Sequence, residues 1–271
     1  MKKSLVALVA AVMLVGLSAC GGSADSAGSE AKAKDAETVA APAKDDPLTK
    51  ENFVERLSAA QLKAKSAQMK MTTSAGGSDM TMNGVVGIDE DVTKSKTKLT
   101  LDMGTGKMEV RMVDGMMYLS MGELTGNKFI KIDLNDPKDP LRDQYGSLAD
   151  QADPEAQLKV FRDALVKFDN QGKDGGQIDG VDTTRIVMVL DTSKVLKGKG
   201  DEATKALGQM PKELEYVIYV GPDDLMRRMT MTVAKSDTTI DWSNWGEPVD
   251  VKAPSKDQIT DASSLMSSFG S

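Results

Sequence analysis

The sequence predicts an α+β protein built on one curved antiparallel β-sheet, a half-barrel with helices packed on its concave face. Apolar and polar residues alternate in about six consecutive segments between residues 69 and 132, the pattern of strands with one face in solvent. A second group of alternating segments follows residue 176, after a stretch with helical spacing, so strands and helices are segregated along the chain. Together they predict about ten to eleven strands, enough for a twisted sheet to curl.

The first residues have the form of a bacterial lipoprotein signal peptide. Lys2 and Lys3 precede an unbroken apolar run, Leu5 to Leu17, which is shorter than the ~20 apolar residues of a membrane span. The ending Leu17-Ser18-Ala19-Cys20 resembles a lipobox. That resemblance implies cleavage before Cys20, diacylglycerol on its sulfur, and anchoring on the extracytoplasmic side of the cell membrane. An ordinary secretory signal with a chance cysteine is the alternative.

We therefore expect three segments: a signal peptide at 1–19, the lipidated cysteine with a flexible tether at 20–47, and a single folded domain at 48–271. Residues 21–47 consist mainly of Gly, Ser, Ala, Lys, Asp and Glu, with no apolar period. Such a composition does not bury enough apolar surface to fold, so this segment would separate the domain from the membrane.

Composition argues against several classes of function. The chain has no histidine, which removes the commonest general base and metal ligand, and Cys20 is the only cysteine. The formal net charge of −7 becomes −9 without Lys2 and Lys3, which argues against nucleic acid as a partner. There is no G-x-S-x-G motif and no glycine-rich phosphate loop. We expect no enzymatic activity, cofactor or metal, although a carboxylate pair for glycoside hydrolysis is a tertiary property that stays open.

In the first half of the domain, a helix is expected from Thr49 to about Lys65, and the strands follow it. The helix presents one apolar face, made of Phe53, Leu57, Ala60 and Ala64. Asp114-Gly115 is a strong signal for a two-residue hairpin turn. The apolar positions of the expected strands are Met69, Met71, Met80, Met82, Val86, Ile88, Leu99, Leu101, Met103, Met108, Val110, Met112, Met117, Leu119, Met121, Ile130 and Ile132.

The second half should start with the clearest amphipathic helix, opened by Asp153-Pro154. Its apolar face would be Leu158, Phe161, Leu165 and Phe168. Strands resume at Gly176, and one has apolar residues on both faces over 186–190, so we expect it to be covered on both sides. A short helix at 201–210, a hairpin around 221–224, a last strand at 238–242 and a polar tail, helical near Ile259, complete the prediction.

Three segments resemble the LppX/LprG family of actinobacterial lipoproteins. They are Ile178-Asp179-Gly180-Val181, the strand–turn–strand from Tyr216 to Met229, and Ile240-Asp241-Trp242-Ser243-Asn244-Trp245-Gly246-Glu247-Pro248-Val249-Asp250-Val251. The resemblance covers most of the chain in element order. It implies a U-shaped sheet like that of LolA and LolB, with an apolar cavity that binds acylated lipids or lipoglycans and moves them toward the outer envelope. The many methionines and few aromatic residues depart from that family.

The candidate ligand-binding residues lie on the apolar side of the central strands and of the second helix. They are Met82, Leu101, Met103, Met108, Val110, Met112, Met117 and Leu119, with Leu158, Phe161 and Leu165 from the helix. Methionine lines adaptable apolar surfaces, so acyl chains would be selected by size and shape. For any one of these residues, a place in a closed core is the competing interpretation.

The sequence gives weaker support for metal or sugar binding. The methionine pairs at 69/71, 80/82 and 229/231 could bind copper(I), but residues i and i+2 on any buried strand face show the same spacing. The acidic clusters at 89–91 and 133–139 lack the EF-hand pattern of a calcium loop. Trp242 and Trp245 could stack on a sugar, but their spacing of three residues at a strand end favours packing, with one in the core and the other at the rim. A lipid carrier is the leading hypothesis, and a sensor or accessory lipoprotein that acts through an envelope protein is the alternative.

Overall fold

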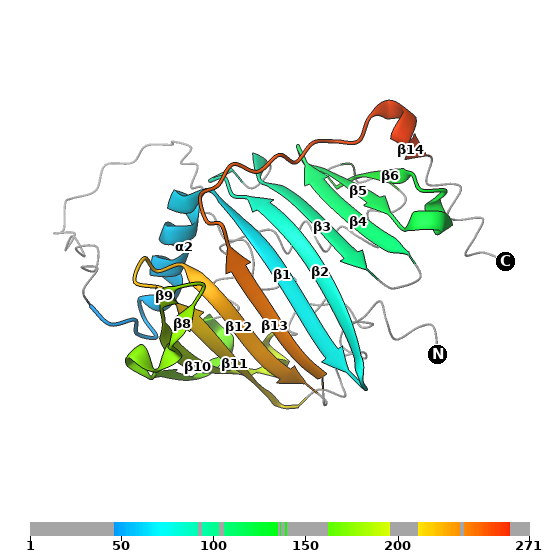
Figure 1. Cartoon of the computed structure of the whole chain (residues 1–271). Helices are drawn as coiled ribbons and strands as arrows, with labels where there is room; N and C mark the ends of the chain where they lie inside the picture. The colour runs from blue at the N-terminus through cyan, green and yellow to red at the C-terminus, as the bar shows by residue number, and fades with distance from the viewer. Residues whose placement is uncertain are drawn as a thin grey trace, which may run out of the picture.

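The computed structural model describes residues 46–91, 94–102, 106–134, 136, 139, 162–195, 211–233 and 236–260. These residues are mostly strands with few helices, and twelve strands form one curved, mixed sheet that is not closed into a barrel (Figure 1). The signal peptide, Cys20 and most of the tether lie outside the described residues, as does the helix expected at 201–210. Those assignments remain predictions.

The sheet is made of two meanders that meet side by side. The first is β1 (Ser66–Ala75), β2 (Ser78–Gly87), β3 (Lys96–Asp102), β4 (Lys107–Val113), β5 (Met116–Ser120) and β6 (Phe129–Asp133). The second is β10 (Thr184–Asp191), β11 (Glu213–Val220), β12 (Met226–Val233) and β13 (Ser236–Ser243). β13 pairs antiparallel with β1, and the sheet order is β14-β6-β5-β4-β3-β2-β1-β13-β12-β11-β10-β7. The expected meanders are therefore confirmed.

Two strands at the edges of the sheet were predicted as something else. β7 (Leu165–Asn170) pairs antiparallel with β10, and β14 (Ile259–Thr260) pairs parallel with β6. These segments raise the strand number above ten to eleven and make the sheet mixed. The helical turn near Ile259 is instead a short 3-10 helix, η5 (Lys256–Gln258), just before β14.

The prediction that the second helix continues to Phe168 was wrong because of a β-bulge. The pairing of β7 with β10 runs Lys167 opposite Val189 and then Leu165 opposite Leu190, so Val166 has no partner and is 52% exposed. A bulge inserts one extra residue, which puts residues i and i+3 on the same side of a strand. Leu165 and Phe168 therefore share one face with the spacing that a helix would also produce.

Helix α2 (Phe53–Ala64) follows a local hydrogen-bonded turn. The Thr49 amide donates to the Asn52 side-chain oxygen at 2.8 Å, and the Asn52 amide donates to the Thr49 hydroxyl at 3.4 Å. The helix ends where Lys65 adopts a left-handed conformation, with φ 67°. Its buried residues are Phe53, Leu57, Ser58 and Gln61, so the packed face is rotated slightly from the expected one.

An almost buried ion pair fastens α2 to the second meander. The Arg56 guanidinium donates to both carboxylate oxygens of Asp224, at 3.0 and 2.7 Å, and the two side chains are only 9% and 15% exposed. Asp224 lies in the β11–β12 turn with φ 61°. Next to it, Arg227 pairs with Asp223 at 2.6 Å and lies in a bulge between β11 and β12. The turn thus presents two carboxylates, each neutralised by an arginine.

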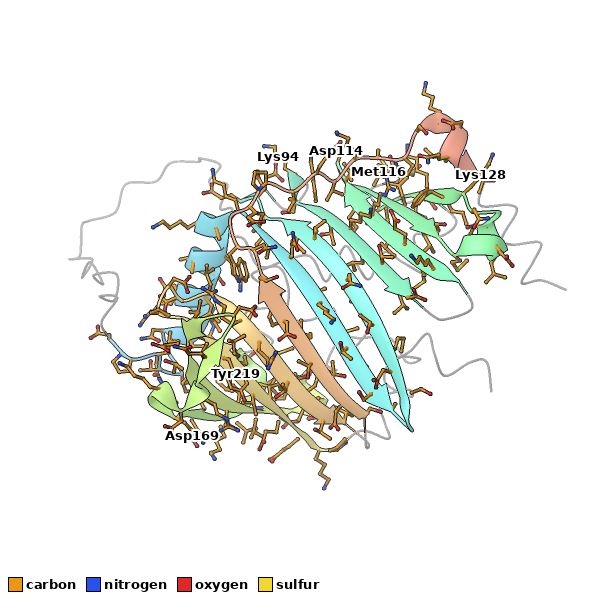
Figure 2. All side chains as sticks on the ribbon, viewed as in Figure 1. Lys94, Asp114, Met116, Lys128, Asp169 and Tyr219 are labelled. Carbon is orange, nitrogen blue, oxygen red and sulfur yellow. The ribbon has the colours of Figure 1, made fainter. Side chains whose placement is uncertain are left out.

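The chain after β13 turns at Trp245-Gly246 and crosses the ends of the first-meander strands (Figure 1). The Gly246 amide donates to the Ser66 carbonyl at 3.0 Å, and Gly246 has φ 82°, a conformation that glycine adopts without strain. Further along, Arg111 of β4 donates to the Lys252 carbonyl at 3.1 Å. Asp114 and Met116 mark this edge of the sheet in Figure 2. This C-terminal segment is therefore part of the fold.

Three smaller elements complete the described structure. They are η3 (Gly122–Thr125), η4 (Gly172–Gly175) and α5 (Thr192–Val195). A separate hairpin, β8 (Gln177–Ile178) with β9 (Val181–Asp182), precedes β10. The predicted turn at Asp114-Gly115 is confirmed, with φ 53° and 73°. β10 is buried on both faces, as predicted, because Val187 is 7% exposed while Ile186 and Met188 on the opposite face are 0% exposed.

We expect Arg56→Ala to lower the free energy of unfolding by about 2–4 kcal/mol, because it leaves Asp224 without its counter-charge in a largely buried place. Urea denaturation followed by tryptophan fluorescence would measure the change. Lys94→Ala is the control, since the Lys94–Asp91 pair is exposed and should contribute less than about 1 kcal/mol. Equal losses in the two variants would contradict the assigned role of Arg56.

Candidate functional site

One face of the sheet carries a continuous band of apolar side chains across both meanders. Strand pairing aligns one side chain from each of eight neighbouring strands, β4 to β1 and then β13 to β10. We call this set the Ile240 row, and it comprises Met108, Leu101, Met82, Met71, Ile240, Met229, Ile218 and Ile186. All are at most 5% exposed except Met108, which is partly exposed. The row contains no charged or polar side chain.

A neighbouring row on the same face contains hydroxyl groups. This Tyr216 row comprises Met80, Thr73, Thr238, Met231, Tyr216, Met188 and Phe168. Thr73 and Thr238 are 3% and 5% exposed, and their hydroxyl oxygens lie 3.1 Å apart. Met80, Met231 and Phe168 are partly exposed. This row is therefore mostly apolar, with hydroxyl groups at three positions, Thr73, Thr238 and Tyr216.

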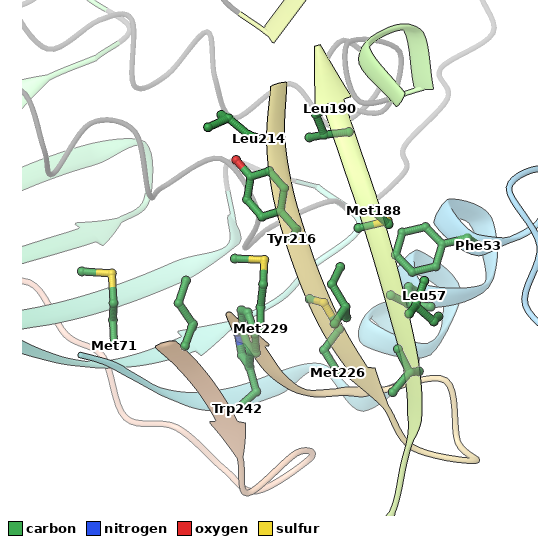
Figure 3. Close-up of a cluster of buried hydrophobic side chains, with 14 of the residues drawn as sticks. Phe53, Leu57, Met71, Met188, Leu190, Leu214, Tyr216, Met226, Met229 and Trp242 are labelled. Atoms are coloured by element: carbon green, nitrogen blue, oxygen red, sulfur yellow. The ribbon is translucent and has the colours of Figure 1, made fainter. Parts of the chain in front are cut away.

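Helix α2 covers the part of this face formed by the second meander. Phe53 meets Phe168 edge to face, with ring centroids 5.4 Å apart. Figure 3 shows Phe53 and Leu57 beside Met188 of β10. Phe53 and Leu57 belong to one buried cluster with Met71, Met82 and Leu101 of the first meander. The apolar face is therefore a single core that spans both meanders.

The opposite face of the first meander is polar, which confirms that one side of this meander is wet. Glu109 of β4 accepts a hydrogen bond from Arg111 at 2.6 Å and pairs with Lys98 of β3 at 3.8 Å. The Arg111 guanidinium also lies over the Phe129 ring, 4.7 Å from its centroid. Charged groups therefore collect on this side and leave the apolar face uncharged.

The structure brings together the predicted site residues that it describes, but in two clusters. Met82, Leu101 and Leu165 are in the large cluster, and Met117 is in a second one with Ile130, Ile132 and Leu134. Val110 packs against both clusters, Met108 against the first and Met112 against the second, and all three are partly exposed. Leu119 is 5% exposed on the same face. Met103, Leu158, Phe161 and Cys20 lie outside the described residues.

Sequence reasoning missed the half of this face that the second meander supplies. Met188, Tyr216, Met229 and Ile240 are each at most 9% exposed and lie on the same face as Met82. Met229 and Ile240 each lie between polar residues in the sequence, whereas Met188 lies between Val187 and Val189. Nothing in the sequence shows that β13 pairs with β1, and this pairing makes one surface of the two meanders.

The methionine pairs and the tryptophans have structural roles. Both members of each pair, at 69/71, 80/82 and 229/231, lie on the apolar face and pack in the large cluster. Trp242 is 3% exposed in the core, whereas Trp245 is partly exposed and donates from its indole nitrogen to the Met226 carbonyl at 2.9 Å. This matches the expected division into one core and one rim tryptophan.

Burial changes the chemistry of one group on this face. Loss of solvation raises the pKa of the Tyr216 phenol above its ordinary value near 10. The phenol therefore stays protonated at neutral pH and can donate a hydrogen bond.

Among the described residues we find neither a cluster of metal-ligating side chains nor a helix that could span a membrane. No three acidic, cysteine or histidine side chains among them come together as ligands could. None of their helices has the length and apolarity required to cross a bilayer.

Comparison with known proteins gives similarity at the level of fold. No protein-family model and no curated protein matches the sequence. Among solved structures, LprF from Mycobacterium bovis is 16% identical with a TM-score of 0.48, over 75% of this chain and 97% of LprF. Lipoprotein LppX from Mycobacterium tuberculosis is 12% identical with a TM-score of 0.46, over 75% of this chain and 100% of LppX. LprF and LppX are lipoproteins of the LppX/LprG type, the resemblance found in the sequence.

A third solved structure is MucB in complex with MucA(peri). It is 14% identical with a TM-score of 0.42, over 76% of this chain and 59% of MucB.

We predict that methionines of the Ile240 row differ in their contribution to stability according to their burial. Met229→Ala should lower the free energy of unfolding by about 2–4 kcal/mol, because it empties a fully packed position. Met108→Ala should cost less than about 1.5 kcal/mol, since this side chain is already partly exposed. Chemical denaturation of both variants checks the difference. Equal losses of stability in the two variants would mean that Met108 is packed as tightly as Met229.

A second prediction concerns alkaline pH. The pKa of Tyr216 is higher in the folded than in the unfolded protein, so its contribution to stability is fully present below about pH 10 and is lost as the pH rises through the folded pKa. Tyr216→Phe should therefore reduce the loss of stability above pH 10. Thermal unfolding between pH 8 and 11.5 measures this. Tyr219→Phe, on the opposite face of β11, is the control and should leave the alkaline decrease in place.

Proposed function

We propose that this protein is a lipid-anchored envelope protein that binds the acyl chains of a lipid on its apolar sheet face and carries that lipid across the cell envelope. In this proposal, Cys20 holds the protein to the extracytoplasmic side of the cell membrane. The apolar face is the concave face of the half-barrel, and the helices cover it. The protein acts by binding rather than by catalysis.

The observation that carries the proposal is the extent of the uncharged face. Strands lie ~4.8 Å apart, so the eight strands of the Ile240 row extend over roughly 34 Å. Each leaflet of a bilayer has a hydrocarbon depth of ~15 Å, half of the ~30 Å core. The apolar face therefore has the extent of an acyl chain, which would contact its partly exposed methionines because most of the row is buried. Each methylene transferred from water to such a surface contributes ~0.8 kcal/mol, which makes the hydrophobic effect a sufficient source of affinity.

The side chains on this face suit a ligand of variable shape. Partly exposed methionines at positions 69, 80, 108, 112 and 231 pack against the buried clusters. Methionine is unbranched and polarisable, so it adapts to irregular apolar surfaces. The protein would therefore accept chains of differing length and saturation.

Native mass spectrometry of the full chain bearing Cys20→Ser, secreted and purified without detergent, tests the proposal. We expect a stoichiometric lipid that organic extraction releases and identifies. A clean apo mass, with no uptake after incubation with a membrane lipid extract, would overturn the carrier function. Crosslinking would then look for a protein partner in the envelope.

A pair of variants locates the binding face. Met108→Gln places an amide of similar size on the apolar face, where it should weaken lipid retention by about tenfold because the amide must be desolvated. Lys107→Gln makes an equally small change at the neighbouring exposed position of β4 and should leave retention unchanged. Equal retention by the two variants would show that the ligand does not contact this face.

A further inference from the structure

Tyr216 is a buried residue with a polar atom that no described residue binds. The residue is 9% exposed, and its hydroxyl has no hydrogen-bond partner among the described residues. Figure 3 shows its ring on the same side of β11 as Met188, Met229 and Leu214, with the oxygen at the tip of the ring. A buried hydroxyl without a partner is destabilising, and native proteins rarely retain one without a reason.

The other two hydroxyls of the Tyr216 row differ in this respect. Thr73 and Thr238 are also buried, but their oxygens lie 3.1 Å apart and satisfy each other. Tyr216 is two strands from Thr238, roughly 10 Å away across the sheet, with Met231 between them. The phenol is therefore the one hydroxyl of this row that is available to a ligand.

We propose that the Tyr216 hydroxyl donates a hydrogen bond to an ester carbonyl oxygen of the bound lipid, which makes fatty acyl esters the ligand class. This rests on the proposed function, because it assigns a polar contact to the same apolar face. The chains lie against the partly exposed methionines of this face, such as Met80 and Met231, and the ester group that joins them to the rest of the lipid lies beside Tyr216.

The surroundings of Tyr216 favour a neutral acceptor over an anionic one. The hydrophobic residues of its cluster supply no charged group, so a carboxylate or phosphate packed against them would be desolvated and would gain no counter-ion from that cluster. Arg56 of α2 and Arg227 of β12 are paired with Asp224 and Asp223 in the turn that follows β11. Burial keeps the phenol protonated, so it acts as a donor. A hydrocarbon chain without an ester would leave the hydroxyl unpaired.

Ester and ether lipids of matched chain length distinguish these cases. The full chain bearing Cys20→Ser, stripped of lipid, is incubated with equal amounts of dipalmitoylphosphatidylcholine and its di-O-hexadecyl ether analogue, which lacks both carbonyl groups. Native mass spectrometry measures the ratio retained. We expect the ester to be preferred by about five- to tenfold, the size of one neutral hydrogen bond.

Two matched variants assign that preference to one atom. Tyr216→Phe removes only the hydroxyl and should reduce the ester-to-ether ratio to about one, while the unliganded variant melts at the same or a higher temperature than the parent. Tyr219→Phe makes the same change on the opposite face of β11, labelled in Figure 2, and should keep the preference. A variant that melts at a lower temperature would show that the hydroxyl is already satisfied in the unliganded protein, against the proposal.

The outcomes separate this inference from the proposed function. Retention of neither lipid overturns the lipid-binding function itself. Retention of both in equal amounts by the parent protein leaves lipid binding intact and overturns the role of Tyr216. An unchanged preference in Tyr216→Phe overturns that role as well.

Discussion

The pairing of β1 with β13 is the contact on which the rest of the structure depends. It runs from Gln68 opposite Ser243 to Ala75 opposite Ser236 and joins segments more than 160 residues apart. Because side chains alternate along a strand, a shift of one residue would move the apolar set of one meander to the wet face. This register therefore places Met71 beside Ile240 and makes one continuous apolar surface from two separate meanders.

Several features outside that pairing hold the two meanders and their cover in place. Helix α2 packs on the second meander through Phe53 and is fastened to the β11–β12 turn by Arg56. The C-terminal segment binds β1 at Ser66 and β4 at Arg111 before it adds β14 to the edge of the sheet. These polar and ionic contacts lie around the apolar face, which contains the Thr73–Thr238 hydrogen bond but keeps the uncharged character that the proposed lipid ligand requires.

The chemistry of the face is simple, and this explains why few residues stand out in the sequence. Binding by the hydrophobic effect needs area, not a motif, and the area is distributed over ten strands and many methionines. The Tyr216 hydroxyl is the exception. Tyr216 shares one face of β11 with Leu214 and Ile218, so in the sequence it looks like an ordinary core residue. Only its burial and the absence of a hydrogen-bond partner among the described residues distinguish it.

The sequence by itself determined the strands of both meanders, the Asp114-Gly115 turn, the first helix and the polarity of each strand, because periodicity and turn chemistry are local properties. It also predicts the lipoprotein signal and Cys20, which no described residue tests. Only the tertiary structure decided that β13 lies beside β1, that Leu165 begins a bulged strand instead of continuing a helix, and that Tyr216 is buried with no hydrogen-bond partner in the described part of the chain. Each of these depends on backbone and side chains distant in sequence, and spacing along the chain carries no information about such contacts.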